Sequence, residues 1–476
     1  VHNIDAESSI KIDADNITTN GVVDALATID LDSVSSTIVN GTVNASGNVD
    51  IDSVANIEIN GTINSDANLT INANTGLVSN AALSTGDELV ITSANGSVIL
   101  NDTVVAGDNL TIETINGLLA EALLQSGLDL NISSTEGGVT ANGVINTSGL
   151  LAINAKGDIE LNEDVNVALT SIISVNNDEA DTNSNITIND VFNSDGETQL
   201  LADGNITTNA DLTTLDNLII QSGDSVLLNG NVSAAGLLDL DAANAVNLTE
   251  SKLVQVGTTM NVDSANFEMA SNSTLDVEGA VQLITLADTT VYNIDAEFSI
   301  KIDADNITTN GVVDALATIE LDSATSTIVN GTLNAIANVD IDSVANTEIN
   351  GTVNSDTKLT INANTGLVAN AALSATDNVL ITSNNGSVTL NDSVIAGGNL
   401  TIEAINGILA EALVQSGLDL NITSSQGGVT TNGVLTSAGL LAINAKGNVE
   451  LNEDVNVALT SIISVNNDDV DTNSNI

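Results

Sequence analysis

The sequence predicts an all-β fold, a parallel β-solenoid in which three short strands per coil wind around a shared apolar core. A period of about 20–21 residues, apolar–polar alternation inside each period, and the absence of proline from all 476 residues support this prediction. The period is clearest in residues 29–68, which divide into two similar segments of 20 residues, 29–48 and 49–68. Each segment is too short to bury an apolar face alone, so successive segments must stack on one another.

Composition agrees with strands and limits the partners. Val, Ile, Leu and Ala are spaced by Thr, Ser, Asn and Asp, a mixture that favours strands and turns. The 63 acidic residues face only six basic ones, all Lys, for a formal net charge of −57. So few cations cannot neutralise a phosphate backbone, which excludes nucleic acid. No apolar run is long enough to span a membrane, so we expect no membrane insertion.

Each coil is expected to open with two inward-facing apolar residues separated by one outward-facing residue. Fourteen such starts over 290 residues give about 20.7 residues per coil. Proline would remove a backbone donor needed for pairing with the next coil, so its absence fits. The predicted starts are Ile10, Ile29, Val49, Leu69, Leu89, Leu110, Leu130, Leu151, Ile173, Thr198 (a weak one), Leu218, Leu238, Met260 and Val281.

A longer repeat contains these coils. Residues 1–186 align without gaps to residues 291–476, and about four in five positions are identical. The sequence therefore predicts a first super-repeat at 1–290 and a partial second one at 291–476, continuous as one rod. Neither end resembles the atypical capping coils of solenoids, so we expect the native polypeptide to continue in both directions.

A column of Asn residues marks one corner of the coil. Asn tolerates the left-handed backbone of a sharp corner, and stacked amides can hydrogen-bond from coil to coil. We therefore predict a ladder with positive φ at several members. The apolar residue three positions after each Asn begins the next strand. The column consists of Asn20, Asn40, Asn60, Asn80, Asn101, Asn142, Asn162, Asn189, Asn209 and Asn229.

Outward-facing carboxylates on successive coils form the main candidate site. Carboxylate oxygens at this density suit Ca²⁺, the one cofactor that the sequence indicates. Lys11 should lie beside Asp30, and Lys301 beside Glu320, which relieves part of the repulsion. Bound calcium and a merely solvated acidic face both stay open. The cluster comprises Asp30, Asp32, Asp50 and Asp52, with Glu320, Asp322, Asp340 and Asp342 in the second copy.

Residues 176–185 are polar throughout and are expected to leave the wall as a loop. Asp181, Asn183 and Asn185 have the spacing of the first three ligands in a calcium-binding loop. However, Ile186 stands where such a loop has Gly, and no Glu closes it. A weak calcium site and an ordinary surface loop are the two alternatives.

Glycans are possible partners at Asn-x-Ser/Thr triplets, which are frequent in this Asn-, Ser- and Thr-rich chain. The triplets include those at Asn16, Asn40, Asn60, Asn68, Asn95, Asn109 and Asn131.

The sequence offers few side chains of the kinds that catalysis requires. The single His2 aligns with Tyr292, so any role for it is not repeated. A lyase acting on acidic sugars would need Arg or Lys, and four aromatic residues in total leave almost no platform for stacking sugars. We therefore expect no enzyme activity.

Residues 149–161 and 398–407 resemble the repeats of filamentous-haemagglutinin-type exoproteins and the β-strand repeats of giant bacterial surface proteins. The resemblance implies a right-handed β-helix, located outside the cell or on its surface. It also implies use as an adhesin, stalk or fibre. Together with the repeats, it predicts a non-enzymatic structural protein of a fibre, sheath or stalk that self-associates end to end or laterally. The alternative is an adhesin that recognises a polysaccharide, host or mineral surface along its wall.

Overall fold

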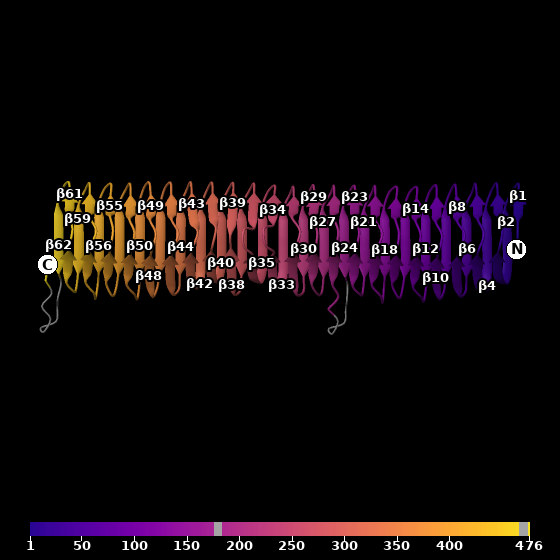
Figure 1. The fold of residues 1–476 in the computed structure, drawn as a ribbon, viewed down its shortest axis with the longest axis horizontal. Coiled ribbons are helices and arrows are strands. Elements are labelled where there is room, and N and C mark those ends of the chain that lie inside the picture. Colours follow the sequence, from indigo (N-terminus) through magenta and orange to yellow (C-terminus); the bar gives the residue numbers. More distant parts are fainter. Residues whose placement is uncertain (176–182, 466–474) are drawn as a thin grey trace. The chain divides into compact units, whose positions relative to one another are not determined.

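The computed structural model describes residues 1–175, 183–465 and 475–476, and over these residues the chain is a parallel β-solenoid. It has about 23 turns, and the described residues contain no helix (Figure 1). The predicted fold class is confirmed.

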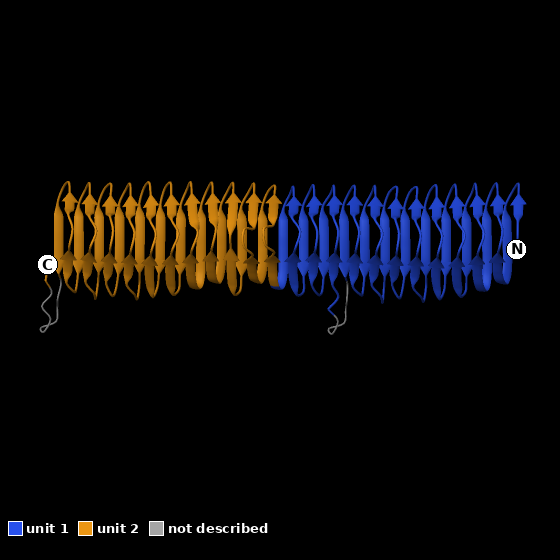
Figure 2. Ribbon diagram, viewed as in Figure 1, with its two compact units in different colours: residues 1–244 blue, residues 245–476 orange. Residues whose placement is uncertain are grey.

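The coils group into two compact units, Val1–Asn244 and Ala245–Ile476 (Figure 2). Within each unit, adjacent coils pair strand to strand in parallel. The two units are defined by packing. The super-repeat boundary at residue 290 is defined by sequence similarity, so the two divisions of the chain need not coincide.

One coil of the first unit shows the construction. Its three strands are followed by the three strands of the next coil, and each pairs in parallel with its counterpart. Three strands per coil were predicted, and the structure confirms them. The two coils are β6 (Val49–Ser53), β7 (Asn56–Ile59) and β8 (Ile63–Ser65), then β9 (Leu69–Ala73), β10 (Gly76–Ser79) and β11 (Leu83–Thr85).

Some coils merge their first two strands into one long strand. The merged strands are β2 (Ile10–Thr19), β4 (Ile29–Val39), β33 (Leu238–Leu248), β35 (Met260–Met269), β40 (Ile300–Thr309) and β42 (Ile319–Val329).

The inward columns follow the predicted register. Ile29 pairs with Val49, which pairs with Leu69, which pairs with Leu89, and all four side chains are buried. Alternation within each strand sends one residue to the core and the next to solvent. The first two inward positions of these strands form apolar columns, whereas the third column contains buried Ser33, Ser53 and Ser93.

A second inward column contains a polar member. Val39 pairs with Ile59, but Ser79 stands between Ile59 and Leu100. Ser79 is fully buried, and its Oγ donates to the carbonyl oxygen of Ala81 at 2.8 Å. This internal bond satisfies the buried hydroxyl within an otherwise aliphatic column.

One predicted coil start is wrong by two residues. The inward residue that pairs with Leu151 is Ser171, and Ile173 pairs with Ile153 instead. Ser171 is completely buried, and its Oγ donates to Ser194 Oγ. A search for apolar starts misses this position because its inward side chain is polar.

Candidate functional site

The predicted carboxylates of the first unit lie together. Pairing of β4 with β6 aligns Asp30 with Asp50 and Asp32 with Asp52, all on the outer face. Four acidic side chains therefore occupy two adjacent strands, which stand roughly 4.8 Å apart.

Lys11 on β2 lies beside this cluster. Its Nζ is 2.6 Å from Oδ2 of Asp30 and 2.6 Å from Oδ2 of Asp32. The hydrogen bond to Asp30, followed by that to Asp32, raises the pKa of Lys11 above its usual value. The predicted pair with Asp30 is confirmed, and the second contact shows that the ammonium bridges two carboxylates.

Asp50 receives no such help. Its Oδ1 is buried without a hydrogen-bond partner. Burial, followed by repulsion from Asp52 and Asp30, raises the pKa of Asp50 to about 6. This carboxyl therefore takes up a proton far more readily than an ordinary aspartate does.

The second unit repeats the arrangement. Lys301 Nζ lies 2.5 Å from Glu320 Oε1 and 3.0 Å from Asp322 Oδ2. Asp340 again has a buried Oδ1 without a partner, and burial again raises its pKa. Asp342 accepts a hydrogen bond from Asn362. Glu320 replaces Asp30 in the second copy. Both copies nevertheless keep an ammonium that bridges two carboxylates and a carboxylate oxygen that is buried without a hydrogen-bond partner.

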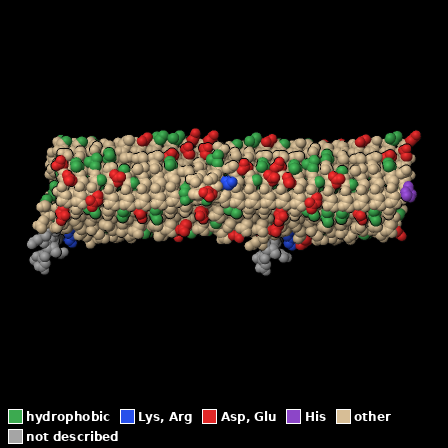
Figure 3. Space-filling model, viewed as in Figure 1, with side chains coloured by type: hydrophobic (Ala, Val, Ile, Leu, Met, Phe, Trp, Pro, Cys, Tyr) green, Lys and Arg blue, Asp and Glu red, His purple; other side chains and the backbone are tan. Residues whose placement is uncertain are grey.

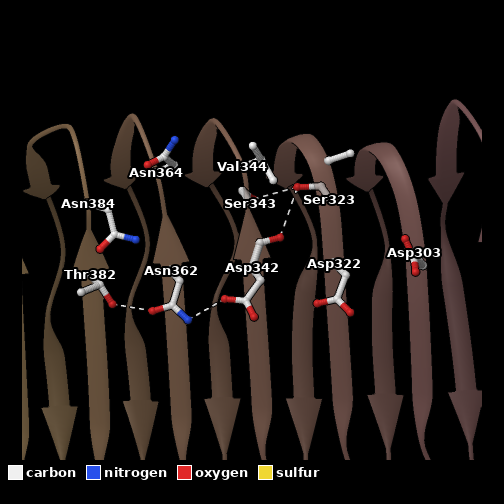
Figure 4. A pocket seen from close by; sticks show the side chains of 11 residues that line it. Asp303, Asp322, Ser323, Asp342, Ser343, Val344, Asn362, Asn364, Thr382 and Asn384 are labelled. Carbon is white, nitrogen blue, oxygen red and sulfur yellow. Dashed lines mark hydrogen bonds between the residues drawn. The ribbon is translucent and has the colours of Figure 1, made fainter.

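An open depression of about 720 Å³ adjoins this second cluster. Asn362 donates to Asp342, and Thr382 donates to Asn362, so the depression has a continuous polar side (Figure 4). Asp303, Asp322, Asp342, Asn362 and Thr382 stand in a row on β40, β42, β44 (Val339–Ser343), β47 (Leu359–Ala363) and β50 (Val379–Ser383).

Calcium binding stays a prediction. Lys11 and Lys301 stand where an ion bridging the outer carboxylates would stand, and Asp52 already accepts a hydrogen bond from Asn72. Within residues 1–175, 183–465 and 475–476, no group of three or more His, Cys, Asp or Glu is arranged to hold a metal ion. An ion would therefore have to displace an ammonium or bind beside Asp50.

The second candidate site is only partly described. Asp181 lies outside the described residues. Asn185 is tied into the wall, because its backbone N–H donates to Asp158 and its Oδ1 accepts from the N–H of Asn205. Asn183 offers its carbonyl oxygen to Asn185. The described part therefore joins one coil to the next, and it does not gather three oxygen ligands.

The corner ladder is present. The amide of Asn60 donates to Asn40, and its oxygen accepts from Asn80, with both bonds between 2.8 and 2.9 Å. The remaining amide bonds join Asn20 to Asn40, Asn80 to Asn101, and Asn142, Asn162, Asn189, Asn209 and Asn229 to one another in sequence.

Two details of the ladder differ from expectation. Glu121 fills the coil between Asn101 and Asn142, and its carboxylate accepts the amide of Asn142. The expected positive φ is wrong, because the described non-glycine residues with positive φ are Ser251 and Asn272, not the corner Asn residues. Amide stacking alone therefore accounts for Asn at this corner.

A second amide ladder was missed. On the short strands, Asn64 donates to Asn44, which donates to Asp24. Asn193, Asn166 and Asn146 are joined in the same way. The spacing of 20 residues from Asp24 to Asn44 to Asn64, and from Asn146 to Asn166, was the signal that could have revealed it.

The outer surface carries scattered acidic side chains, and few Lys side chains interrupt them (Figure 3). Asn40 and Asn60, two of the Asn-x-Ser/Thr positions, already donate their side-chain amides to the ladder, so a glycan there would compete with it. No helix in the described part of the chain is long and apolar enough to cross a membrane.

Comparisons with protein-family models, with curated proteins and with solved structures found no match to this chain.

Proposed function

We propose that this chain is a non-enzymatic structural protein of an extracellular fibre, sheath or cell-surface stalk. One observation carries the proposal: within each unit the outward-facing polar side chains mainly bond to the same positions on neighbouring coils. Asn60 and Asn354, for example, direct their amides along the stack. Side chains used in this way reinforce the stack, and they leave few convergent groups for chemistry on a substrate.

The acidic surface suits such a role. Like charges keep separate chains apart until cations or a dedicated contact bring them together. The likeness to filamentous-haemagglutinin-type repeats supports the location outside the cell and the expected self-association.

The test is assembly by the purified full chain. Negative-stain electron microscopy and sedimentation velocity should show filaments or bundles that form as divalent cations are added. A chain that stays monomeric at all cation concentrations would contradict the proposal.

An adhesin is the second candidate, and the polar depression over β40 to β50 is the observation that favours it. Its row of Asp, Asn and Thr side chains offers donors and acceptors to a polyhydroxylated ligand. Binding of the monomeric chain to a glycan array, lost in Asn362→Ala, would favour the adhesin over the fibre. Asn72→Ala, the matching change in the first unit, is the control.

A further inference from the structure

Three large apolar side chains stand exposed on successive coils of the second unit. Phe298 is 64% exposed, and Leu316 and Ile336 are each 53% exposed. They occupy the turn that follows the short strands β39 (Asn293–Ala296), β41 (Val312–Ala315) and β43 (Thr332–Ala335). We call them the turn patch.

Backbone hydrogen bonds place the three residues on adjoining coils. The N–H of Leu316 donates to Ala296 at 3.0 Å, and the N–H of Ile336 donates to Ala315 at 3.1 Å. The carbonyl of Phe298 accepts from Ala317 at 3.2 Å. Leu316 and Ile336 therefore occupy the same turn position, about one coil spacing apart. Phe298 lies one residue later in its turn, level with Ala317, so it is diagonal to Leu316 on the preceding coil.

The first unit has the same turn without the patch. Leu26 matches Leu316 and is 67% exposed, but Ser8 and Ser46 stand where the second unit has Phe298 and Ile336. Both serines are exposed, so the turn folds with small polar side chains at these two positions. Packing therefore does not require Phe298 or Ile336, and their exposure calls for another explanation.

Carboxylates surround the turn patch. Asp276 on β36 (Thr274–Val277) pairs with Asp295, which pairs with Asp314, giving a row of three on the strands that lead into the turn. Glu278 and Glu297 are exposed in the turn itself. Apolar and acidic side chains are mixed along this edge, over the strands labelled β39 and β43 (Figure 3).

We propose that the turn patch binds a basic amphipathic segment of another protein, with apolar side chains for Phe298, Leu316 and Ile336 and Lys or Arg for the carboxylates around them. Charge selects this occupant. A second copy of the chain also carries 63 acidic residues against six Lys, so without added divalent cations its approach to the turn patch is repelled. Three side chains also bury far less than the roughly 800 Å² per partner of a stable interface, so charge must supply much of the affinity.

The probe is a fluorescent peptide of leucine and lysine with one apolar and one basic face, and its binding to the full chain is followed by anisotropy. The variant F298S/I336S copies the sequence of the first unit and should melt as the unaltered chain does. It should bind the peptide about tenfold more weakly. A lysine–serine peptide, which lacks the apolar face, should bind both chains alike.

The reciprocal variant S8F/S46I builds a second turn patch around Leu26, where Asp5, Glu7 and Asp24 supply the charge. Calorimetry should then find an additional peptide site of similar affinity. Leucine–lysine binding that F298S/I336S leaves unchanged would overturn the proposal. So would sedimentation showing that the unaltered chain dimerises through the turn patch while the variant stays monomeric.

Discussion

At the scale of single residues, the corner ladder carries a clear energetic expectation. Asn60 donates to Asn40 and to Glu58, each at 2.9 Å, and it accepts from Asn80. Asn60→Val removes all three bonds without a backbone penalty, because φ at Asn60 is not positive. We expect a loss of about 1–2 kcal/mol in the free energy of unfolding, measured by urea titration. Unchanged stability would show that the amides bond equally well to water.

Asp50 predicts an unusual dependence of stability on pH. Because its pKa in the folded chain is about 6, above its ordinary value, the folded chain takes up this proton before the unfolded chain does. The contribution of Asp50 to stability therefore improves as the pH falls through about 6, and it is least favourable at alkaline pH.

Asp50→Asn tests this expectation by thermal melting between pH 5 and pH 8. The variant should melt higher than the unaltered chain at pH 8, and the difference should shrink as the pH approaches 5. Asp87→Asn removes an exposed carboxylate as the control. Equal melting temperatures of D50N and the unaltered chain across the range would rule out a destabilising charge at Asp50.

At the scale of strands and turns, close approach between coils fixes certain glycines. A Cβ on Gly41 would lie 2.0 Å from the carbonyl oxygen of Gly21 on the preceding coil. Gly41→Ala should therefore destabilise the chain by about 1–3 kcal/mol, seen as a lower urea midpoint. Gly47→Ala is the milder comparison, because its Cβ would lie 2.8 Å from the carbonyl oxygen of Ala27 and Ala337 occupies the same position in the second copy. Equal losses in both variants would refute the steric argument.

Sequence patterns predicted the inward columns because Val49 and Ile51 alternate with Asp50 and Asp52, and only one face of a strand can be buried. They also predicted which carboxylates would meet, since a fixed period fixes which residues become neighbours. The inward position of Ser171 was not predicted, because serine is typical of surface positions and its buried hydrogen-bond partner, Ser194, cannot be identified from the repeat alone. The bridging of Asp30 and Asp32 by Lys11 depends on side-chain rotamers, which periodicity does not determine.

At the scale of the whole molecule, the net charge of −57 makes folding sensitive to cations. Salt should raise the melting temperature by screening repulsion among carboxylates. Calcium should raise it further than sodium chloride of equal ionic strength if ions bind the folded chain at Asp50 or its neighbours. Calorimetry with calcium, with chelator and with matched salt separates the two effects. An identical response to both salts would remove the calcium site.

The 20-residue spacing between ladder partners has a consequence for how this chain evolves. Ile29, Val49 and Leu69 occupy the same position on consecutive coils, so removal of residues 49–68 brings Ile29 directly against Leu69 and Asn40 against Asn80. This whole-coil deletion should fold and melt cooperatively by circular dichroism. Removal of residues 49–58 should not, because it places strands opposite turns.

Unequal recombination between the two near-identical copies in the gene would exchange whole coils in register. Such a gene can lengthen or shorten its product by a whole super-repeat of 290 residues, which is fourteen coils, without a new core. Selection can then act on length as a quantity separate from stability, because each added coil brings its own buried column and its own amide rung.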